Sequence, residues 1–242
     1  IMGIYSKKIR LRYSDIGSSN RLNLKSLIGY LQEMAGAHSS LAGYGLNDIP
    51  NTHVSWLLLD WKVKMFSHPC YGDELTINTW PRTLEKFYSY RDFEIFDSNN
   101  NLVAIASSKW LLINTETRKI EKITPEIVES YGIVDKCVFN DKLNERPKVP
   151  NDLELTFKYK IQRRDIDTNG HVNNLHYIDY ALETLPEDIY NNNEFSNIEI
   201  HYKKEIKYGE TINCYYSFED NKHVISIMSE DNTVLHSIVK LY

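Results

Sequence analysis

Residues 167–171 place three polar side chains at every second position, in the pattern Asp-x-Asn-x-His. The imidazole of His171 can carry a proton near neutral pH, Asn169 can hold a carbonyl oxygen or orient a water, and Asp167 can orient a neighbour or act on a carbonyl carbon. Glu205, a carboxylate in the basic segment HYKKEIK (201–207), is the candidate fourth member. The residue types therefore favour acid–base chemistry at a carbonyl group.

The same residues have an ordinary structural interpretation. Asp, Asn and Gly ahead of a helix are common capping and turn residues. A single histidine is often a packing or surface residue, and Glu205 has lysines on both sides with which to pair in solvent. The pattern by itself leaves both interpretations open.

An internal duplication separates the two interpretations. With a shift of 150 residues, 14–33 matches 164–183 at six of 20 positions. With a shift of 137, YGDELTINTW (71–80) resembles YGETINCYYS (208–217), so the first copy has 13 additional residues between these segments. Asp165 and Asn173 occur in both copies, which predicts structural roles. The chemical candidates occur in one copy only, since their counterparts are Gly17, Ser19, Arg21 and His68.

Hydrophobic periodicity predicts the same elements in each half: a strand, a helix and four further strands. The first helix is expected at 22–41; the second follows apolar positions from Val172 to Leu185 and is stopped by Pro186. This order predicts an α+β fold with a first domain at 1–130, a connector at 131–152 and a second domain at 153–242. The strands are expected at 7–14, 53–66, 74–81, 86–97 and 102–115, and at 157–164, 195–207, 211–220, 223–230 and 233–242.

Composition narrows the class of protein. The formal net charge of −5 over 242 residues argues against a nucleic-acid binder. The chain contains no run of about 18 apolar residues, so no membrane-spanning helix is expected. The first residues lack the apolar core of a secretory signal. Three widely spaced cysteines form neither a disulfide framework nor a metal-binding pattern. We therefore expect a cytoplasmic protein with no metal and no cofactor.

The chain resembles the acyl-acyl-carrier-protein (acyl-ACP) thioesterases of plants and bacteria. The resemblance is carried by DIDTNGHVNNLHYIDYALETLP and EIHYKKE in the second half, and by YLQEMAGAH, SWLLLDWKVKM, YGDELTINTW and ASSKWLLINTETRKIEKI in the first. It implies a tandem hot-dog fold, in which two antiparallel sheets each wrap a long helix. It also implies hydrolysis of fatty acyl-ACP, which releases the free fatty acid and ends elongation in fatty acid biosynthesis.

The resemblance assigns roles to individual residues. The family's catalytic Asp, Asn, His and Glu correspond to Asp167, Asn169, His171 and Glu205. The cysteine that follows the glutamate in plant members is replaced here by Ile206, so a cysteine nucleophile is not expected. The acyl chain is expected in the first half, where the candidates to line its pocket are Met34, Trp56, Leu58, Trp61 and Trp110. The acidic carrier protein is expected to meet basic residues near the site, namely Arg163, Arg164, Lys203, Lys204 and Lys207.

Several alternatives remain at this stage. An acyl-CoA thioesterase, a hydratase or dehydratase on the same fold, and a non-catalytic acyl-binding protein are the rival functions. Glu205 with His171 would activate a water, or Asp167 would attack directly and form an anhydride. Amides at the start of the second helix are expected to help Asn169 hold the carbonyl oxygen. A monomer and a homodimer are both compatible with a chain that already contains two copies of the fold, and chain length preference is not visible.

Overall fold

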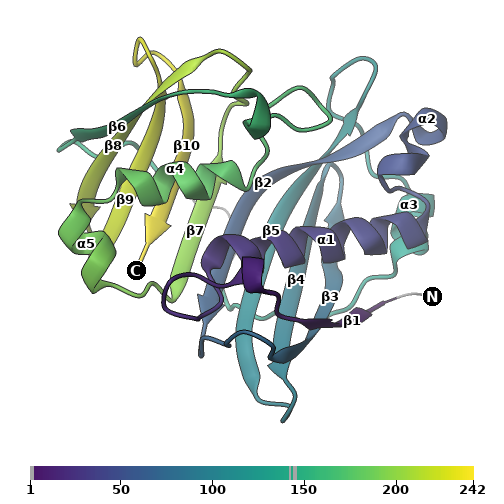
Figure 1. The fold of residues 1–242 in the computed structure, drawn as a ribbon. Coiled ribbons are helices and arrows are strands. Elements are labelled where there is room, and N and C mark those ends of the chain that lie inside the picture. The colour runs from purple at the N-terminus through teal and green to yellow at the C-terminus, as the bar shows by residue number, and fades with distance from the viewer. Residues whose placement is uncertain (1–2, 142, 144–145) are drawn as a thin grey trace. The chain divides into compact units, whose positions relative to one another are not determined.

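The computed structural model describes residues 3–141, 143 and 146–242 of the chain. Two compact units, Ile1–Leu143 and Asn144–Tyr242, divide the chain within residues 131–152, the expected connector. Residues 142, 144 and 145 of that connector lie outside the described residues. Each unit combines one antiparallel sheet with a helix packed on it (Figure 1).

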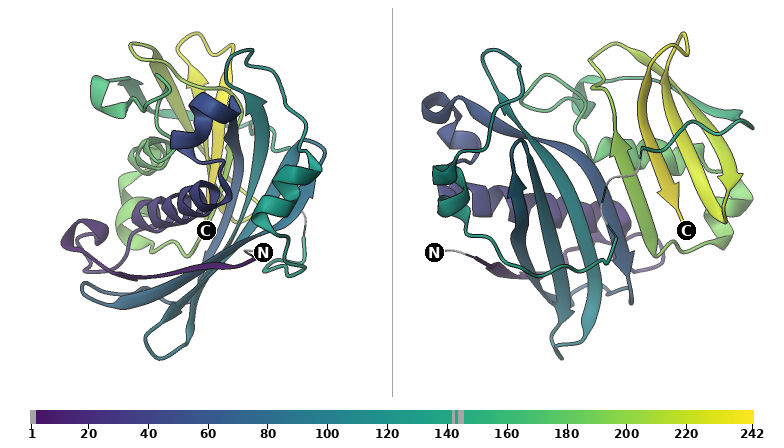
Figure 2. Two further views of the ribbon diagram at one scale, coloured as in Figure 1. Left: turned by 90° about the vertical axis from the view of Figure 1, so that its right-hand side faces the viewer. Right: turned by 180° about the vertical axis from the view of Figure 1, so that it is seen from behind.

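The sheet of the first unit has five strands in the order β1-β3-β4-β5-β2, with every neighbouring pair antiparallel. Alternate residues of β4, including Phe93 and Ile95, are fully buried, as expected where one face of a strand covers a core. The view along the helix shows the sheet curving around it (Figure 2). The strands are β1 (Tyr5–Arg10), β2 (Val54–Met65), β3 (Glu74–Glu85), β4 (Tyr88–Asp97) and β5 (Leu102–Asn114).

Helix α1 (Leu24–Ala42) supplies the other layer of the first unit. The Asn23 side chain caps its start by accepting a hydrogen bond from the Ser26 amide at 2.8 Å. Gly43, with φ +84°, ends it in the left-handed conformation. The buried positions recur every three or four residues, so one face of the helix packs on the sheet; they are Leu24, Leu27, Ile28, Leu31, Met34, Ala35 and His38.

Two short helices follow α1: a 3₁₀ turn at Leu46–Asp48 and α2 (Ile49–Thr52). They lie between α1 and β2, where the two shifts of the duplication predict additional residues. A third short helix, α3 (Pro125–Tyr131), begins with a cap in which the Thr124 side chain accepts from the Ile127 amide.

The second unit repeats this topology. Its strand order, β6-β8-β9-β10-β7, has the same pattern of first, third, fourth, fifth and second strand as the first unit. Helix α4 (His176–Thr184) packs on this sheet. The predicted α+β order of one strand, a helix and four strands is confirmed in both halves. The strands are β6 (Glu154–Lys160), β7 (Asn197–Tyr202), β8 (Thr211–Glu219), β9 (Lys222–Ser229) and β10 (Leu235–Leu241).

The end of the second helix ahead of Pro186 agrees with the prediction, but α4 begins at His176 and not near Val172, and the end of the following strand also differs. Helix α4 ends at Thr184 and a separate short helix, α5 (Glu187–Asn192), follows Pro186, which cannot continue the helical hydrogen bonds. Strand β7 ends at Tyr202, so Glu205 lies beyond the strand rather than within it. The apolar alternation of 195–207 continues past the strand because Ile206 is buried where its backbone pairs with Val172.

The residues shared by both copies have structural roles. Asp15 accepts a hydrogen bond from the Arg12 amide at 2.8 Å, and Asp165 accepts one from the Gln162 amide at the same distance. Both carboxylates are buried, and both close a 3₁₀ turn directly after the first strand of the unit. The repeated aspartate therefore fixes the path from strand to helix in each unit.

Over the part of the chain that the structure describes, no helix is both long and apolar enough to cross a membrane. Within the same residues, no group of three or more His, Cys, Asp or Glu side chains is arranged to hold a metal ion.

Candidate active site

A tight reversal of the chain carries three of the four candidate catalytic residues. The Asp167 amide donates to the His171 carbonyl at 2.8 Å, and the Gly170 amide donates to the Asp167 carbonyl at 3.1 Å. Gly170 has φ +77°, a left-handed conformation that glycine adopts without steric cost. The reversal precedes α4 by several residues, so these side chains lie on a turn and not on the first turn of the helix.

The first unit contains the same reversal with other side chains. Its Gly17 amide donates to the Arg21 carbonyl at 3.0 Å, and its Asn20 amide donates to the Gly17 carbonyl at 3.0 Å. Asn20, which corresponds to Gly170, has φ +59°. The backbone of the turn is therefore common to both units. Only the second unit carries side chains on this turn that are suited to acid–base chemistry.

The carboxylate of Asp167 is engaged within its own turn. Its Oδ1 accepts hydrogen bonds from the Asn169 amide at 2.8 Å and the His171 amide at 3.4 Å. An aspartate that binds the amide two residues later closes a compact turn. Asp167 thus holds the backbone that carries both of the other candidates.

His171 and Glu205 meet through the pairing of two segments. The Val172 amide donates to the Ile206 carbonyl at 2.9 Å, and His171 forms a backbone bridge with Lys207. This contact buries Ile206 and brings His171 Nε2 to 3.0 Å from Glu205 Oε2. The predicted fourth member is therefore in direct contact with the histidine.

The corresponding contact in the first unit supports the alignment of the two copies. The Leu22 amide donates to the Pro69 carbonyl at 2.8 Å, and Arg21 forms a backbone bridge with Cys70. The shift of 150 residues relates Arg21 and Leu22 to His171 and Val172. The shift of 137 residues relates Pro69 and Cys70 to Ile206 and Lys207.

Asn169 lies at the exposed tip of the turn, with its amide bound to Asp167 and its side chain directed away from the core. The amides at the start of α4 are engaged differently from our expectation. The Leu175 amide donates to Asn173 Oδ1 at 3.0 Å, and the His176 amide donates to the Asn173 carbonyl at 3.0 Å. Asn173 therefore engages the Leu175 and His176 amides, and the side chain of Asn169 is the candidate donor that the turn itself offers to a carbonyl oxygen.

A buried tyrosine lies behind the carboxylates and was not among the residues singled out from the sequence. Burial, and secondarily the charge of Glu205, raises the pKa of Tyr177. Its ring packs edge-on against Tyr202 at 5.1 Å, and the Tyr202 hydroxyl donates to the Asn174 carbonyl at 3.1 Å. Tyr177 thus stays a neutral phenol. In the sequence, Tyr177 lies on the apolar face of the predicted helix, and this position indicates that it is buried.

All five of the expected carrier-binding residues are exposed in the second unit. Arg163 and Arg164 form the 3₁₀ turn after β6 and line a shallow depression with Lys160 and Tyr208. Lys204 and Lys207 line another depression, which also contains Glu205 and several acidic residues. The two arginines therefore give the more uniformly basic surface of the two.

The first unit contains a partly open pocket of about 200 Å³ between α1, α2 and the sheet. Two of the expected lining residues, Trp56 and Trp110, form part of its wall. The other three, Met34, Leu58 and Trp61, are buried but are not part of that wall. They face the core between helix and sheet, where apolar periodicity alone cannot distinguish packing from ligand contact.

Family comparison covers almost the whole chain. The model of the acyl-ACP thioesterase N-terminal domain matches residues 3–131, and that of the C-terminal domain matches residues 150–240. The chain belongs to the acyl-ACP thioesterase family.

Family relatives with solved structures share the fold. A putative oleoyl thioesterase from Lactobacillus plantarum has a TM-score of 0.85 at 23% identity, covering 99% of this chain and 95% of that one. An acyl-ACP thioesterase from Bacteroides thetaiotaomicron has a TM-score of 0.88 at 21% identity, covering 98% and 96%. The predicted tandem hot-dog fold is confirmed.

Curated relatives of this acyl-ACP thioesterase family member include plant proteins. The chain is 25% identical to an oleoyl-acyl carrier protein thioesterase of Arabidopsis thaliana, covering 94% of this chain and 66% of the relative. It is 27% identical to a palmitoyl-acyl carrier protein thioesterase of Cuphea hookeriana, covering 84% and 52%. The chain therefore spans about half to two thirds of the length of these relatives.

The backbone conformation that the two turns share allows a test of why Gly170 is a glycine. Gly170→Ala should lower the free energy of unfolding by about 1–2 kcal/mol, because a residue with a Cβ is strained in the left-handed region. An added Cβ meets no other atom within 4 Å, so the cost is one of backbone conformation alone. Gly170→Asn is the matched control and should cost less, since Asn20 adopts this conformation in the first unit. Urea unfolding measures both, and equal costs would contradict the explanation.

Proposed function

We propose that the protein hydrolyses the thioester of fatty acyl-ACP and releases the free fatty acid, as an enzyme of fatty acid biosynthesis in the cytoplasm. The observation that carries the proposal is the contact of His171 Nε2 with Glu205 Oε2 at 3.0 Å, beside a turn that also presents Asn169. Membership of the acyl-ACP thioesterase family agrees with this chemistry.

Glu205 and His171 are suited to activate a water. The Glu205 side chain is 39% exposed and that of His171 16%, so solvent reaches the carboxylate while the histidine is held beside it. An ionised carboxylate only accepts hydrogen bonds, so Nε2 of His171 carries the hydrogen in this contact. Glu205 then has an oriented partner and an accessible oxygen, as a general base requires.

The reaction balances with these groups. Glu205 takes a proton from water as the water oxygen bonds to the carbonyl carbon, and the carbonyl electron pair moves to its oxygen. The Asn169 side-chain amide donates to that oxygen as negative charge develops there. When the carbonyl re-forms, the carbon–sulfur bond breaks, and the departing thiolate takes a proton from the Glu205–His171 pair.

Asp167 holds the turn in this proposal and does not attack the substrate. Its Oδ1 already binds two backbone amides, which stabilises the turn and lowers the availability of that oxygen as a nucleophile. Water attack therefore accounts for the geometry better than an anhydride intermediate at Asp167.

The partner and the acyl pocket complete the proposal. The pocket of the first unit, with Trp56 and Trp110 in its wall, is the proposed site of the acyl chain, since a fatty acid needs a concave, mostly apolar site. An acidic carrier protein is proposed to dock on the exposed basic residues of the second unit, led by Arg163 and Arg164.

Removing any of the three central side chains should abolish most of the activity. Asn169→Ala, His171→Ala and Glu205→Ala are each expected to lower kcat at least about a hundredfold, because each removes an oxyanion donor or a proton-transfer group. Since His171 and Glu205 act as one unit, the double variant should lose little more than either single variant. Acyl-ACP hydrolysis with Thr168→Ala as the exposed control is the measurement. Near-normal turnover of a folded Asn169→Ala protein would refute the assignment.

Two substitutions at Asp167 separate its alternative roles. Asp167→Asn keeps an oxygen that accepts from the two amides, so we expect a loss of less than about tenfold if Asp167 holds the turn. Asp167→Ala removes the acceptor and should cost more than Asp167→Asn. A loss above about a thousandfold in Asp167→Asn would instead indicate attack by the carboxylate. Steady-state kinetics, together with thermal unfolding as a check on folding, decide between these outcomes.

Docking of an acidic carrier should depend on salt and on the arginines of the second unit. We expect the KM for acyl-ACP to rise about three- to tenfold in Arg164→Glu, and to rise with ionic strength in the unaltered protein. Lys119→Glu, an equal charge change at an exposed site of the first unit, is the matched control. A KM for acyl-ACP that responds to neither salt nor Arg164→Glu would contradict this docking surface. Acyl-CoA assayed in parallel tests the rival carrier.

A further inference from the structure

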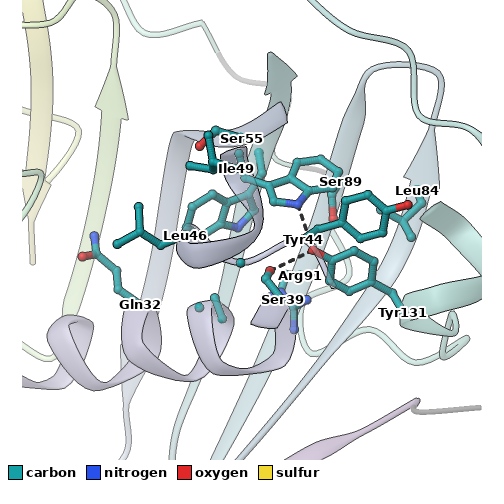
Figure 3. Close-up of a pocket in the computed structure, with 15 residues that line it drawn as sticks. Gln32, Ser39, Tyr44, Leu46, Ile49, Ser55, Leu84, Ser89, Arg91 and Tyr131 are labelled. Carbon is teal, nitrogen blue, oxygen red and sulfur yellow. Dashed lines mark hydrogen bonds between the residues drawn. The ribbon is translucent and has the colours of Figure 1, made fainter. Parts of the chain in front are cut away.

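A buried guanidinium forms part of the wall of the first-unit pocket. Arg91 on β4 is only 4% exposed, yet it lines the pocket together with Ser89, two residues earlier on the same face of the strand. Figure 3 shows it between α1 and the rings of Tyr44 and Tyr131. An acyl chain made only of methylene groups gives such a residue nothing to bind.

Arg91 has no acidic partner among the described residues. Its Nη1 donates to His38 Nδ1 at 3.0 Å and to Thr79 Oγ1 at 3.1 Å, and both partners are neutral. The neighbouring carboxylate of Asp92 points to the opposite face of the strand, where it binds Arg82 at 3.0 Å. A charge that is buried without a counter-charge is costly unless further hydrogen bonds satisfy it.

The groups that the described residues place against Arg91 are neutral, and the ring of Tyr131 lies 5.9 Å from its guanidinium carbon. Burial lowers the pKa of Arg91 to about 10, so the group stays charged near neutral pH. Burial, and then the charge of Arg91, lowers the pKa of His38 to about 4, so the imidazole is neutral. Because Arg91 only donates, Nδ1 of His38 is the acceptor and Nε2 carries the hydrogen. That Nε2 is buried and lacks a partner within the described residues.

His38 lies behind Arg91 and is not part of the pocket wall, but one unsatisfied donor does line the pocket. Nε2 of Gln32 is buried and has no hydrogen-bond partner in the described part of the chain. Gln32 and Ser39 lie two helical turns apart on α1, and Figure 3 places Gln32 at one end of the lining residues and Tyr131 at the other. The wall also includes the apolar groups of Leu46, Ile49 and Trp110. The pocket is thus an apolar cavity with a buried donor near each end.

We propose that this pocket accepts acyl chains that carry an oxygen substituent, and that Arg91 donates a hydrogen bond to that oxygen. A hydroxyl or a carboxylate oxygen on the chain has the required chemistry, because both accept hydrogen bonds from a guanidinium. The identity of the ligand as an acyl chain rests on the proposed function; the requirement for an acceptor oxygen rests on Arg91 and Gln32 in the pocket wall.

The test measures binding and not hydrolysis. The probes are acyl-pantetheine amides, in which an amide replaces the thioester, so the protein does not cleave them and the chain carries no other carboxylate. One series places a single hydroxyl at successive carbons, one compound has a terminal carboxylate, and unsubstituted chains of matched length are the reference. Calorimetric titration should show at least one oxygenated chain binding about tenfold to a hundredfold more tightly than its parent.

Arg91→Met should remove that preference. Methionine has similar length and no donor, so plain chains should bind as well as before or better, while the favoured oxygenated chain should lose about tenfold to a hundredfold. Leu84→Met, also in the pocket wall, is the matched control and should affect both kinds of chain alike. If Arg91→Met does not fold, Arg91→Lys replaces it: the shorter, compact ammonium should weaken the preference at the same carbon.

The outcomes are distinct. A gain for hydroxylated chains identifies a hydroxyl as the ligand group, and a gain for the carboxylate alone identifies an anion; both support the proposal if they depend on Arg91. No gain at any position, a gain that persists in Arg91→Met, or a gain that is undiminished in Arg91→Lys overturns it. Arg91-dependent binding of oxygenated chains by a protein that does not hydrolyse acyl-ACP would leave this inference standing and refute only the proposed function.

Discussion

The candidate active site depends on one short piece of backbone pairing. The Val172 amide binds the Ile206 carbonyl, and this contact sets His171 beside Glu205 although the two are 34 residues apart in the sequence. Helix α4, α5 and strand β7 all lie between the two segments, so the fold of the whole second unit is needed to place one carboxylate. Asp165 fixes the chain before the turn, Asp167 closes the turn, and Asn173 caps the segment after it.

Duplication lets the two units carry different functions on the same frame. The first unit keeps the reversal, the backbone bridge and the cap, but places Gly17, Ser19 and Arg21 where the second has its polar set. It has instead a partly open pocket with additional short helices beside α1. The backbone-to-backbone hydrogen bonds of the reversal and the bridge are present in both units although the side chains differ, so positions 17, 19 and 21 are able to carry other residues without loss of the fold.

Arg91 shows how the alternation of a strand carries information that its composition hides. In β4 the inward positions Phe93 and Ile95 are apolar, and Arg91 continues the same period. A charged residue at an inward position breaks the expected pattern, and such violations concentrate at functional sites. Asp92 is the next residue in the sequence, which suggests a salt bridge between Arg91 and Asp92. The pleat of the strand directs the two side chains to opposite faces instead. Only the arrangement of both faces shows that the cation lies toward the pocket and the carboxylate toward Arg82.

The repeat, the α+β order and the residues of the turn followed from the sequence, because period, shift and residue type are properties of the chain itself. Comparison of the two copies also separated the shared Asp165 and Asn173 from Asp167, Asn169 and His171. The contact of His171 with Glu205, the use of the α4 amides by Asn173, and the division of Met34, Leu58 and Trp61 from the pocket wall were decided by tertiary structure. Apolar periodicity reports which face of an element is buried, but it does not report whether the space beyond that face is filled by side chains or left open as a cavity.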